Sequence, residues 1–181
     1  MNIEAAQRDF RDSYLGGAPG VLVSALAWFT AGLVSIYQSP RQAVIVLLVG
    51  GMLIHPLSTL LVKALGRSAK SAAGNPMTRL ALESTVWLIF SIPAAYALSR
   101  FRIEWFFPAM MLAIGGRYLV FATMYGSRIF WLCGGALGAA AYALVVLGAG
   151  PSVGALTGAA IEAIFAAAIF LRSRGRAGNL R

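Results

Sequence analysis

Four ionisable side chains lie within or at the edge of long apolar stretches, and they are the sequence's candidates for chemistry. His55 exchanges a proton near neutral pH, and Arg117 offers a permanent positive charge to an anion. Glu162 is a carboxyl, which carries a proton or balances a positive charge. Glu83 lies four residues after Arg79, a spacing that predicts a pair of side chains on one helix face. The first three residues therefore predict proton transfer or anion binding.

Six apolar stretches surround these residues, and each is long enough to cross a bilayer. A helix needs about 20 apolar residues to span the hydrocarbon core. The chain has 181 residues, of which 59% are hydrophobic and 12% charged, whereas ordinary soluble domains are roughly a quarter charged. We therefore predict an all-α membrane protein, a bundle of six transmembrane helices at residues 20–37, 42–62, 77–98, 105–125, 129–147 and 153–171.

The residues before the first span predict a short helix of another kind. Ile3, Ala6, Phe10 and Tyr14 recur at spacings of three and four, which places them on one face with charged residues opposite. A short amphipathic helix of this kind lies in the membrane interface. Since the segment lacks the pattern of a cleaved secretory signal, we expect it to be retained.

Basic residues are sorted between the two sides of the predicted bundle. Of the 15 Lys and Arg residues, Arg117 lies within a span, and Arg41, Arg100 and Arg102 lie in gaps on one side. The other eleven fall on the opposite side, together with both termini. Because basic loops stay in the cytoplasm, we expect a multi-pass protein of the bacterial inner membrane with cytoplasmic N- and C-termini.

Three of the candidate residues reach one depth on three different helices. A helix rises about 1.5 Å per residue, so His55, Arg117 and Glu162 each lie roughly 10 to 14 Å from the cytoplasmic ends of their spans. An arginine at mid-span costs about 2.5 to 3.5 kcal/mol to insert, and it needs a partner or a wet cavity. Glu162 is the expected partner, because Gly154 and Gly158 precede it at intervals of four and turn that face into the bundle.

The sequence leaves two interpretations of these residues open. In the first, Arg117 contacts an anionic solute, Glu162 is its counter-ion or proton site, and His55 titrates, as in a small-solute or proton-linked carrier or binding protein. Helices broken at Pro56 and Pro93 would line its cavity. In the second, Arg117 and Glu162 form a structural ion pair. The protein is then a structural or partner-binding subunit without transport or catalysis.

Other classes of site find no support in the sequence. The net charge of +9 follows from the loops, so no soluble basic face is left for nucleic acid. Cys133 is the only cysteine, which rules out an intrachain disulfide, and a single histidine rules out paired-histidine zinc motifs. An intramembrane enzyme with His55 as its base is the least favoured alternative, because no nucleophile or metal ligands accompany it. We expect no catalytic residues, no metal and no cofactor.

The middle of the chain resembles an uncharacterised family. The resemblance covers about residues 50–135 and rests on short motifs: His55-Pro56-Leu57, Leu60, Lys63, a basic loop ending in Asn75-Pro76, Phe107-Pro108, Gly115-Gly116 and the aromatic stretch at 118–131. These motifs resemble a domain-of-unknown-function family of small bacterial multi-pass membrane proteins. Where that pattern has a histidine after the central small pair, this chain has Arg117. The resemblance implies a membrane location and no known activity.

The chain divides into three parts on these grounds. An interfacial helix at residues 1–15 precedes a transmembrane domain at 16–172 and a basic cytoplasmic tail at 173–181. The bilayer is the main partner, and anionic lipid matches the basic loop after the second span and the tail. A homodimer is a further assembly that the sequence allows.

Overall fold

The computed structural model describes residues 2–178, with side chains up to Ser173. Within these residues the chain forms α-helices and no strand: α1 (Ile3–Ser13), α2 (Ala18–Tyr37), α3 (Pro40–Ala64), α4 (Pro76–Phe101), α5 (Phe106–Tyr125), α6 (Ile129–Val146) and α7 (Pro151–Gly178). Two 3₁₀ turns, η1 (Leu15–Gly17) and η2 (Ile103–Trp105), precede α2 and α5. Six helices are long and apolar enough to cross a membrane, which confirms the predicted fold class.

Capping residues explain where the two outer helices begin. The side chains of Ser39 and Asn75 accept backbone hydrogen bonds from the first turns of α3 and α4, and each is followed by proline at the first helical position. The prediction of helices broken at Pro56 and Pro93 is wrong, because α3 and α4 run through both residues. Unwinding a helix in lipid exposes further backbone polar groups, whereas an internal proline frees only one carbonyl.

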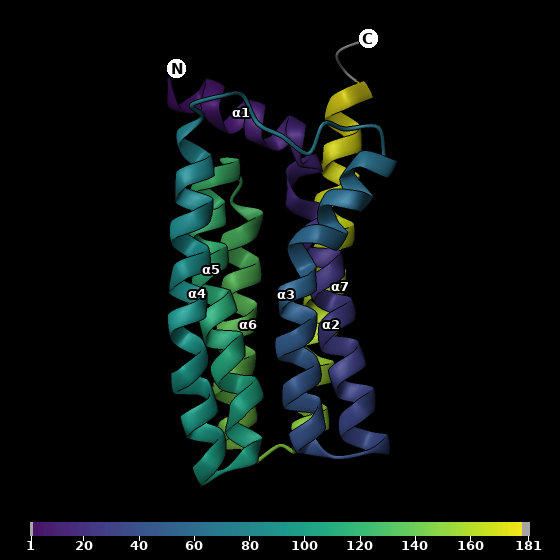
Figure 1. Ribbon diagram of the computed structural model, residues 1–181, viewed down its shortest axis with the longest axis vertical. Helices are drawn as coiled ribbons and strands as arrows, with labels where there is room; N and C mark the ends of the chain where they lie inside the picture. The colour runs from purple at the N-terminus through teal and green to yellow at the C-terminus, as the bar shows by residue number, and fades with distance from the viewer. Residues whose placement is uncertain (1, 179–181) are drawn as a thin grey trace.

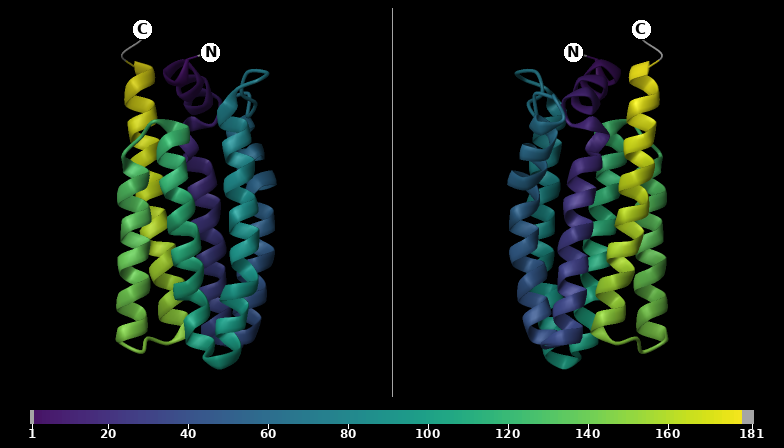
Figure 2. Two further views of the ribbon diagram at one scale, coloured as in Figure 1. Left: turned by 90° about the vertical axis from the view of Figure 1, so that its left-hand side faces the viewer. Right: turned by 90° about the vertical axis from the view of Figure 1, so that its right-hand side faces the viewer.

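The six long helices form two halves that stand side by side in Figure 1 and one in front of the other in Figure 2. α2 packs against both α3 and α7, and we call these three helices the α2 half. α5 packs against both α4 and α6, which form the α5 half with it. Contacts between the halves run mainly from α7 to α6 and α5. The last helix therefore returns to the first long one, and it also joins the two halves.

Glycine residues bring the helices close together within each half. A Cβ atom on Gly32 of α2 would lie 2.6 Å from the Leu156 side chain of α7. In the α5 half, a Cβ atom on Gly115 would lie 2.9 Å from the carbonyl oxygen of Gly134 on α6. Small residues at such contacts let membrane helices pack backbone against backbone. Each half is therefore a tightly packed unit.

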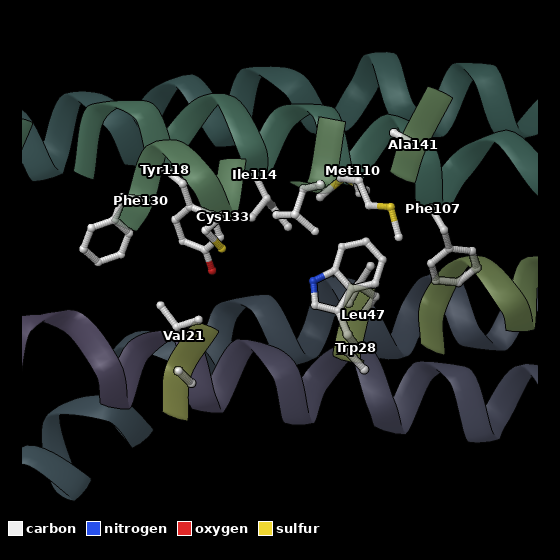
Figure 3. Packing of buried hydrophobic residues seen from close by; sticks show 14 of the residues in the cluster. Val21, Trp28, Leu47, Phe107, Met110, Ile114, Tyr118, Phe130, Cys133 and Ala141 are labelled. Carbon is white, nitrogen blue, oxygen red and sulfur yellow. The ribbon is translucent and has the colours of Figure 1, made fainter. Parts of the chain in front are cut away.

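Large side chains fill the space between the two halves (Figure 3). Trp28 of α2 packs against Phe107 of α5, with ring centroids 6.0 Å apart. Met110 and Ile114 of α5 extend the same buried cluster, and Leu47 of α3 joins it from the α2 half. The contact between the halves thus depends mainly on bulky apolar side chains.

Helix α1 lies across the end of the bundle at which both termini lie, which we call the α1 end (Figure 1). The Asn2 side chain accepts a hydrogen bond from the Ala5 backbone at 2.9 Å and so caps the helix. Ala6 and Phe10 are buried beneath it, as the amphipathic pattern predicts, whereas Ile3 of the same face is exposed, like Glu4 and Arg8. At the same end α7 continues to Gly178, and residues 179–181 of the predicted basic tail lie outside the described residues.

Candidate functional site

Glu162 of α7 lies at the interface between the two halves and is fully buried. Its Oε1 atom accepts a hydrogen bond from the Tyr118 hydroxyl of α5 at 2.8 Å, so this bond joins one half to the other. The Ser24 hydroxyl of α2 lies beside the same carboxyl. Its Oε2 atom accepts no hydrogen bond of standard geometry from the described residues.

The local sequence explains why Glu162 points inward. Gly154 and Gly158 lie two turns and one turn before it on α7. A Cβ atom on Gly158 would lie 2.8 Å from the Trp28 ring, and one on Gly154 would lie 3.0 Å from the Phe107 side chain. This face of α7 therefore packs against both halves, as its stripe of small residues predicts.

Arg117 contacts α4 and forms no ion pair with Glu162 among the described residues, although it is the neighbour of Tyr118. Its Nη2 atom donates a hydrogen bond to Thr85 Oγ1 of α4 at 3.0 Å, and its guanidinium carbon lies 5.1 Å from the centroid of the Phe121 ring. Its Nε atom is buried and has no partner among the described residues. Successive residues on a helix point in different directions, so Tyr118 meets α7 while Arg117 meets α4. Among the described residues, no ion pair forms between Arg117 and Glu162.

His55 is separate from both residues. It lies on α3, where it is exposed, as are most of residues 51–60. Most of the buried residues of α3 lie near its start, at Ala43, Val44 and Leu47, and Val62 is buried near its end. The structure thus leaves the three candidate residues in three environments: one buried between the halves, one between α4 and α5, and one on the outer surface of α3.

The exposed pair predicted on α4 is present. Arg79 Nε lies 3.1 Å from Glu83 Oε1, and both side chains are well exposed. An exposed pair of this spacing contributes a few tenths of a kcal/mol to a helix, roughly 0.3–0.5. Glu83 therefore differs sharply from Glu162, which makes it a natural control for experiments on the buried carboxyl.

Sequence reasoning missed the residues that surround Glu162. The sequence places Tyr118 in an aromatic stretch, and its pattern does not single out Ser24 or Trp28. The signal available for the last two was their spacing of four on one face of the first span. Trp28 is fully buried, and its indole nitrogen has no partner among the described residues. Figure 3 shows this nitrogen and the Tyr118 hydroxyl on the inner side of the bundle.

The chemistry open to this arrangement is that of an isolated carboxyl. Among the described residues, no Lys, Arg or His nitrogen lies within 4.0 Å of the Glu162 oxygens. In the same part of the chain, no three His, Cys, Asp or Glu side chains cluster as metal ligands do. A buried carboxyl of this kind takes up or gives up a proton, or balances a cation.

In the described part of the chain, six membrane-length helices with a polar group buried between two halves define a multi-pass integral membrane protein. More particularly, the chain belongs to DUF7010, a family of unknown function whose family model matches residues 3–172. This confirms the resemblance to an uncharacterised family. No curated protein and no solved structure matches the chain.

Proposed function

We propose that this protein is a proton-linked carrier of a small solute, and that Glu162 is its proton-carrying group. The observation that supports this proposal is the place of Glu162, fully buried and bonded to Tyr118 across the interface between the halves. Ionisable residues inside membrane bundles are costly, and they commonly mark proton relays and solute pathways. With both termini in the cytoplasm of a bacterium, the α1 end would face inward.

The two-part architecture supports a mechanism for such a carrier. Many carriers expose their site alternately by rocking one rigid bundle against another. Here glycine contacts bring helices together within each half, while bulky side chains, the contact of Gly154 with Phe107 and the Tyr118–Glu162 hydrogen bond join the halves. A hydrogen bond to an ionised carboxylate is roughly twice as strong as one between neutral groups. Proton uptake by Glu162 therefore weakens the link between the halves, which couples protonation to their movement.

Arg117 supplies the second polar position in this proposal. Its Nε atom has no partner in the described part of the chain, and Thr85 orients the other end of its guanidinium group. An anionic group of a solute would accept hydrogen bonds from the donors of this side chain that have no partner. His55 has no role in this proposal, because it is exposed on α3.

The proposal is tested with purified protein reconstituted into liposomes. A panel of anions, organic cations, amino acids and sugars is applied, and charge movement is recorded on a supported membrane in the presence of a proton gradient. A solute that produces a transient in the wild type, and none in Glu162→Gln, supports the proposal. Glu83→Gln is the matched control and should behave as wild type, since Glu83 is an exposed surface residue.

Infrared difference spectroscopy gives a readout that needs no solute. Wild-type protein taken from alkaline to acid pH should gain the carbonyl stretch of a buried protonated carboxyl. This band should be missing from Glu162→Gln and present in Glu83→Gln. If the band is present in all three proteins, or absent from the wild type, Glu162 does not exchange a proton and the proposal fails.

The alternative function is a structural or partner-binding subunit, and one observation favours it. Most of residues 51–60 of α3 are exposed, including His55, so this part of the helix packs little against the rest of the chain. A partner subunit or a second copy would cover it. Lys63, Arg67 and Lys70, which follow on the same side, are exposed and match anionic lipid. A stoichiometric partner that co-purifies from native membranes and is lost on His55→Trp would favour this function.

A further inference from the structure

Two side chains of α1 are bonded to the end of α5. Gln7 Nε2 donates to the Thr123 carbonyl and Arg11 Nη1 donates to the Tyr125 carbonyl, both at 2.6 Å. The last carbonyls of a helix have no partner within the helix, and side chains from elsewhere commonly satisfy them. α1 therefore caps α5 from outside, through contacts that break without unfolding either helix.

Two further side chains tie α1 to the segment before α4. Asp9 Oδ2 accepts hydrogen bonds from the Ala72 backbone at 2.9 Å and from Asn75 Nδ2 at 2.7 Å. Ser13 Oγ donates to the Lys70 carbonyl at 3.0 Å. The partners of α1 thus belong to the α5 half or lead into it, whereas the chain itself joins α1 to α2. α1 spans the two halves at the α1 end, as Figure 1 shows.

The connection between α1 and α2 has the geometry of a hinge. Leu15, Gly16 and Gly17 in η1 have φ values of 51°, 64° and 86°, which are left-handed. Leucine is strained in this region, whereas glycine is not. Three such residues in succession turn α1 away from the axis of α2, so the two helices are not one continuous α-helix. Rotation here would move α1 while α2 stays in place.

A chain of contacts leads from α1 down to the buried carboxyl. The Phe10 ring lies 5.3 Å from the Tyr125 ring, which stacks at 5.2 Å on Phe130. Phe130 lies 6.0 Å from Tyr118, whose hydroxyl bonds to Glu162. These rings occupy the space between Glu162 and the α1 end, and Phe10 is the outermost of them.

We propose that α1 is a hinged lid that closes the α1 end of the bundle above Glu162, and that it lifts for access from that side. The inference rests on the proposed function, because it names the regulation of the same site. With the lid closed, Gln7 and Asp9 hold the α5 half to a helix that the α2 half carries. When the lid lifts, Phe10 separates from Tyr125, and the aromatic side chains between α1 and Glu162 become accessible from the α1 end.

The lid is tested by the accessibility of a cysteine next to the site. Ser24→Cys places a thiol beside the Glu162 carboxyl with little change in size, in a Cys133→Ala background that removes the native thiol. The rate of its reaction with a small cationic methanethiosulfonate is measured in nanodiscs. Gln7→Ala combined with Asp9→Ala should raise this rate at least 10-fold, since each lost hydrogen bond changes an equilibrium by roughly fivefold.

Arg8→Ala is the matched control, because Arg8 is exposed on the same helix. Its labelling rate should equal that of the parent. An unchanged rate in the Gln7→Ala/Asp9→Ala protein overturns the lid, and so does an equal acceleration by Arg8→Ala. The second outcome would indicate general loosening. Circular dichroism and size-exclusion profiles of each variant establish that it is folded before labelling.

A reversible cross-link gives an independent measurement. Gln7→Cys and Thr123→Cys, whose native residues are bonded, are joined by a bifunctional methanethiosulfonate of short span. A thiol at position 24 would itself react with this reagent, so it is left out of this protein. Charge movement driven by the solute from the transport assay is recorded instead. Current should stop on cross-linking and return on reduction, while single-cysteine proteins keep theirs. Current that persists through complete cross-linking overturns the lid.

The two proposals fail in distinguishable ways. If labelling at position 24 depends on Gln7 and Asp9 but the infrared band of Glu162 is absent, the lid stands and the proton-linked function falls. If the band is present and labelling ignores both residues, the function stands and the lid falls.

Discussion

Replacing Tyr118 by phenylalanine removes the hydrogen bond that Glu162 receives across the interface between the halves. The ring keeps its place, because Phe121 and Phe130 pack against it at centroid distances of 5.6 and 6.0 Å. The change therefore isolates one hydroxyl, and it leaves the carboxyl oxygen Oε1 buried without that donor. Glu162→Gln makes the complementary change, since it removes the charge and keeps an oxygen that accepts from Tyr118.

The magnitudes of the two changes follow from the nature of the bond. A hydrogen bond to a charged group contributes about 1.5–3 kcal/mol, and a neutral one about 0.5–1.5 kcal/mol. Tyr118→Phe should therefore lower the free energy of unfolding by about 2–3 kcal/mol when Glu162 is ionised. In the Glu162→Gln background the same change should cost about 1 kcal/mol. The coupling between the two residues is then about 1–2 kcal/mol.

A double-mutant cycle measures this coupling. Unfolding of the four proteins in mixed micelles is followed by circular dichroism at alkaline pH, where the carboxyl is ionised. Tyr142→Phe is the control for loss of a tyrosine hydroxyl, because Tyr142 is exposed on α6, and its cost should be near zero. If Tyr118→Phe costs the same in both backgrounds, within about 0.5 kcal/mol, the residues are uncoupled and the geometry described for Glu162 is refuted.

Two further changes test the packing and the surface. Gly158→Ala places a Cβ atom 2.8 Å from the Trp28 ring, and in thermal unfolding it should lower the free energy of unfolding by about 1–3 kcal/mol. A Cβ atom on Gly138 meets nothing within 4 Å, so Gly138→Ala should raise the free energy of unfolding by about 0.5–1 kcal/mol. Equal effects of the two changes would contradict the close approach of α2 and α7. Glu83→Gln breaks an exposed pair with Arg79 and should change the free energy of unfolding by less than about 1 kcal/mol in denaturant titrations. A larger loss would place that pair in the interior.

The spans were readable from the sequence because lipid imposes a simple condition on them. A membrane helix must be long, apolar and internally hydrogen-bonded, so its length and composition suffice to find it. The predicted starts at residues 42 and 77 lie within two residues of the first residues of α3 and α4. The sequence does not show that α3 and α4 continue through Pro56 and Pro93, because a proline removes one hydrogen bond and the surroundings decide whether the helix breaks there.

The candidate site was only partly readable, because depth does not determine direction. The rise per residue predicts a common depth for Glu162, Arg117 and His55. The direction in which each side chain points from its helix depends on which neighbouring helices pack there. The small-residue stripe gave that information for Glu162, which is buried as expected. No stripe of small residues marked the packed helix face at Arg117 or His55. In the structure Arg117 bonds to Thr85 of α4, and His55 is exposed.

The return of α7 to the α2 half has a consequence for how the protein is made. A chain is synthesised from its N-terminus, so α2 and α3 enter the membrane before α7, and the α2 half stays incomplete until α7 is inserted. Helices α4, α5 and α6 are consecutive, and they are able to assemble while synthesis continues. Glu162 arrives with the last helix, when Tyr118 and Ser24 are already in the bilayer. The costliest acidic residue thus enters a membrane in which its partners are already present, and insertion of α7 completes the α2 half and joins it to the α5 half in one step.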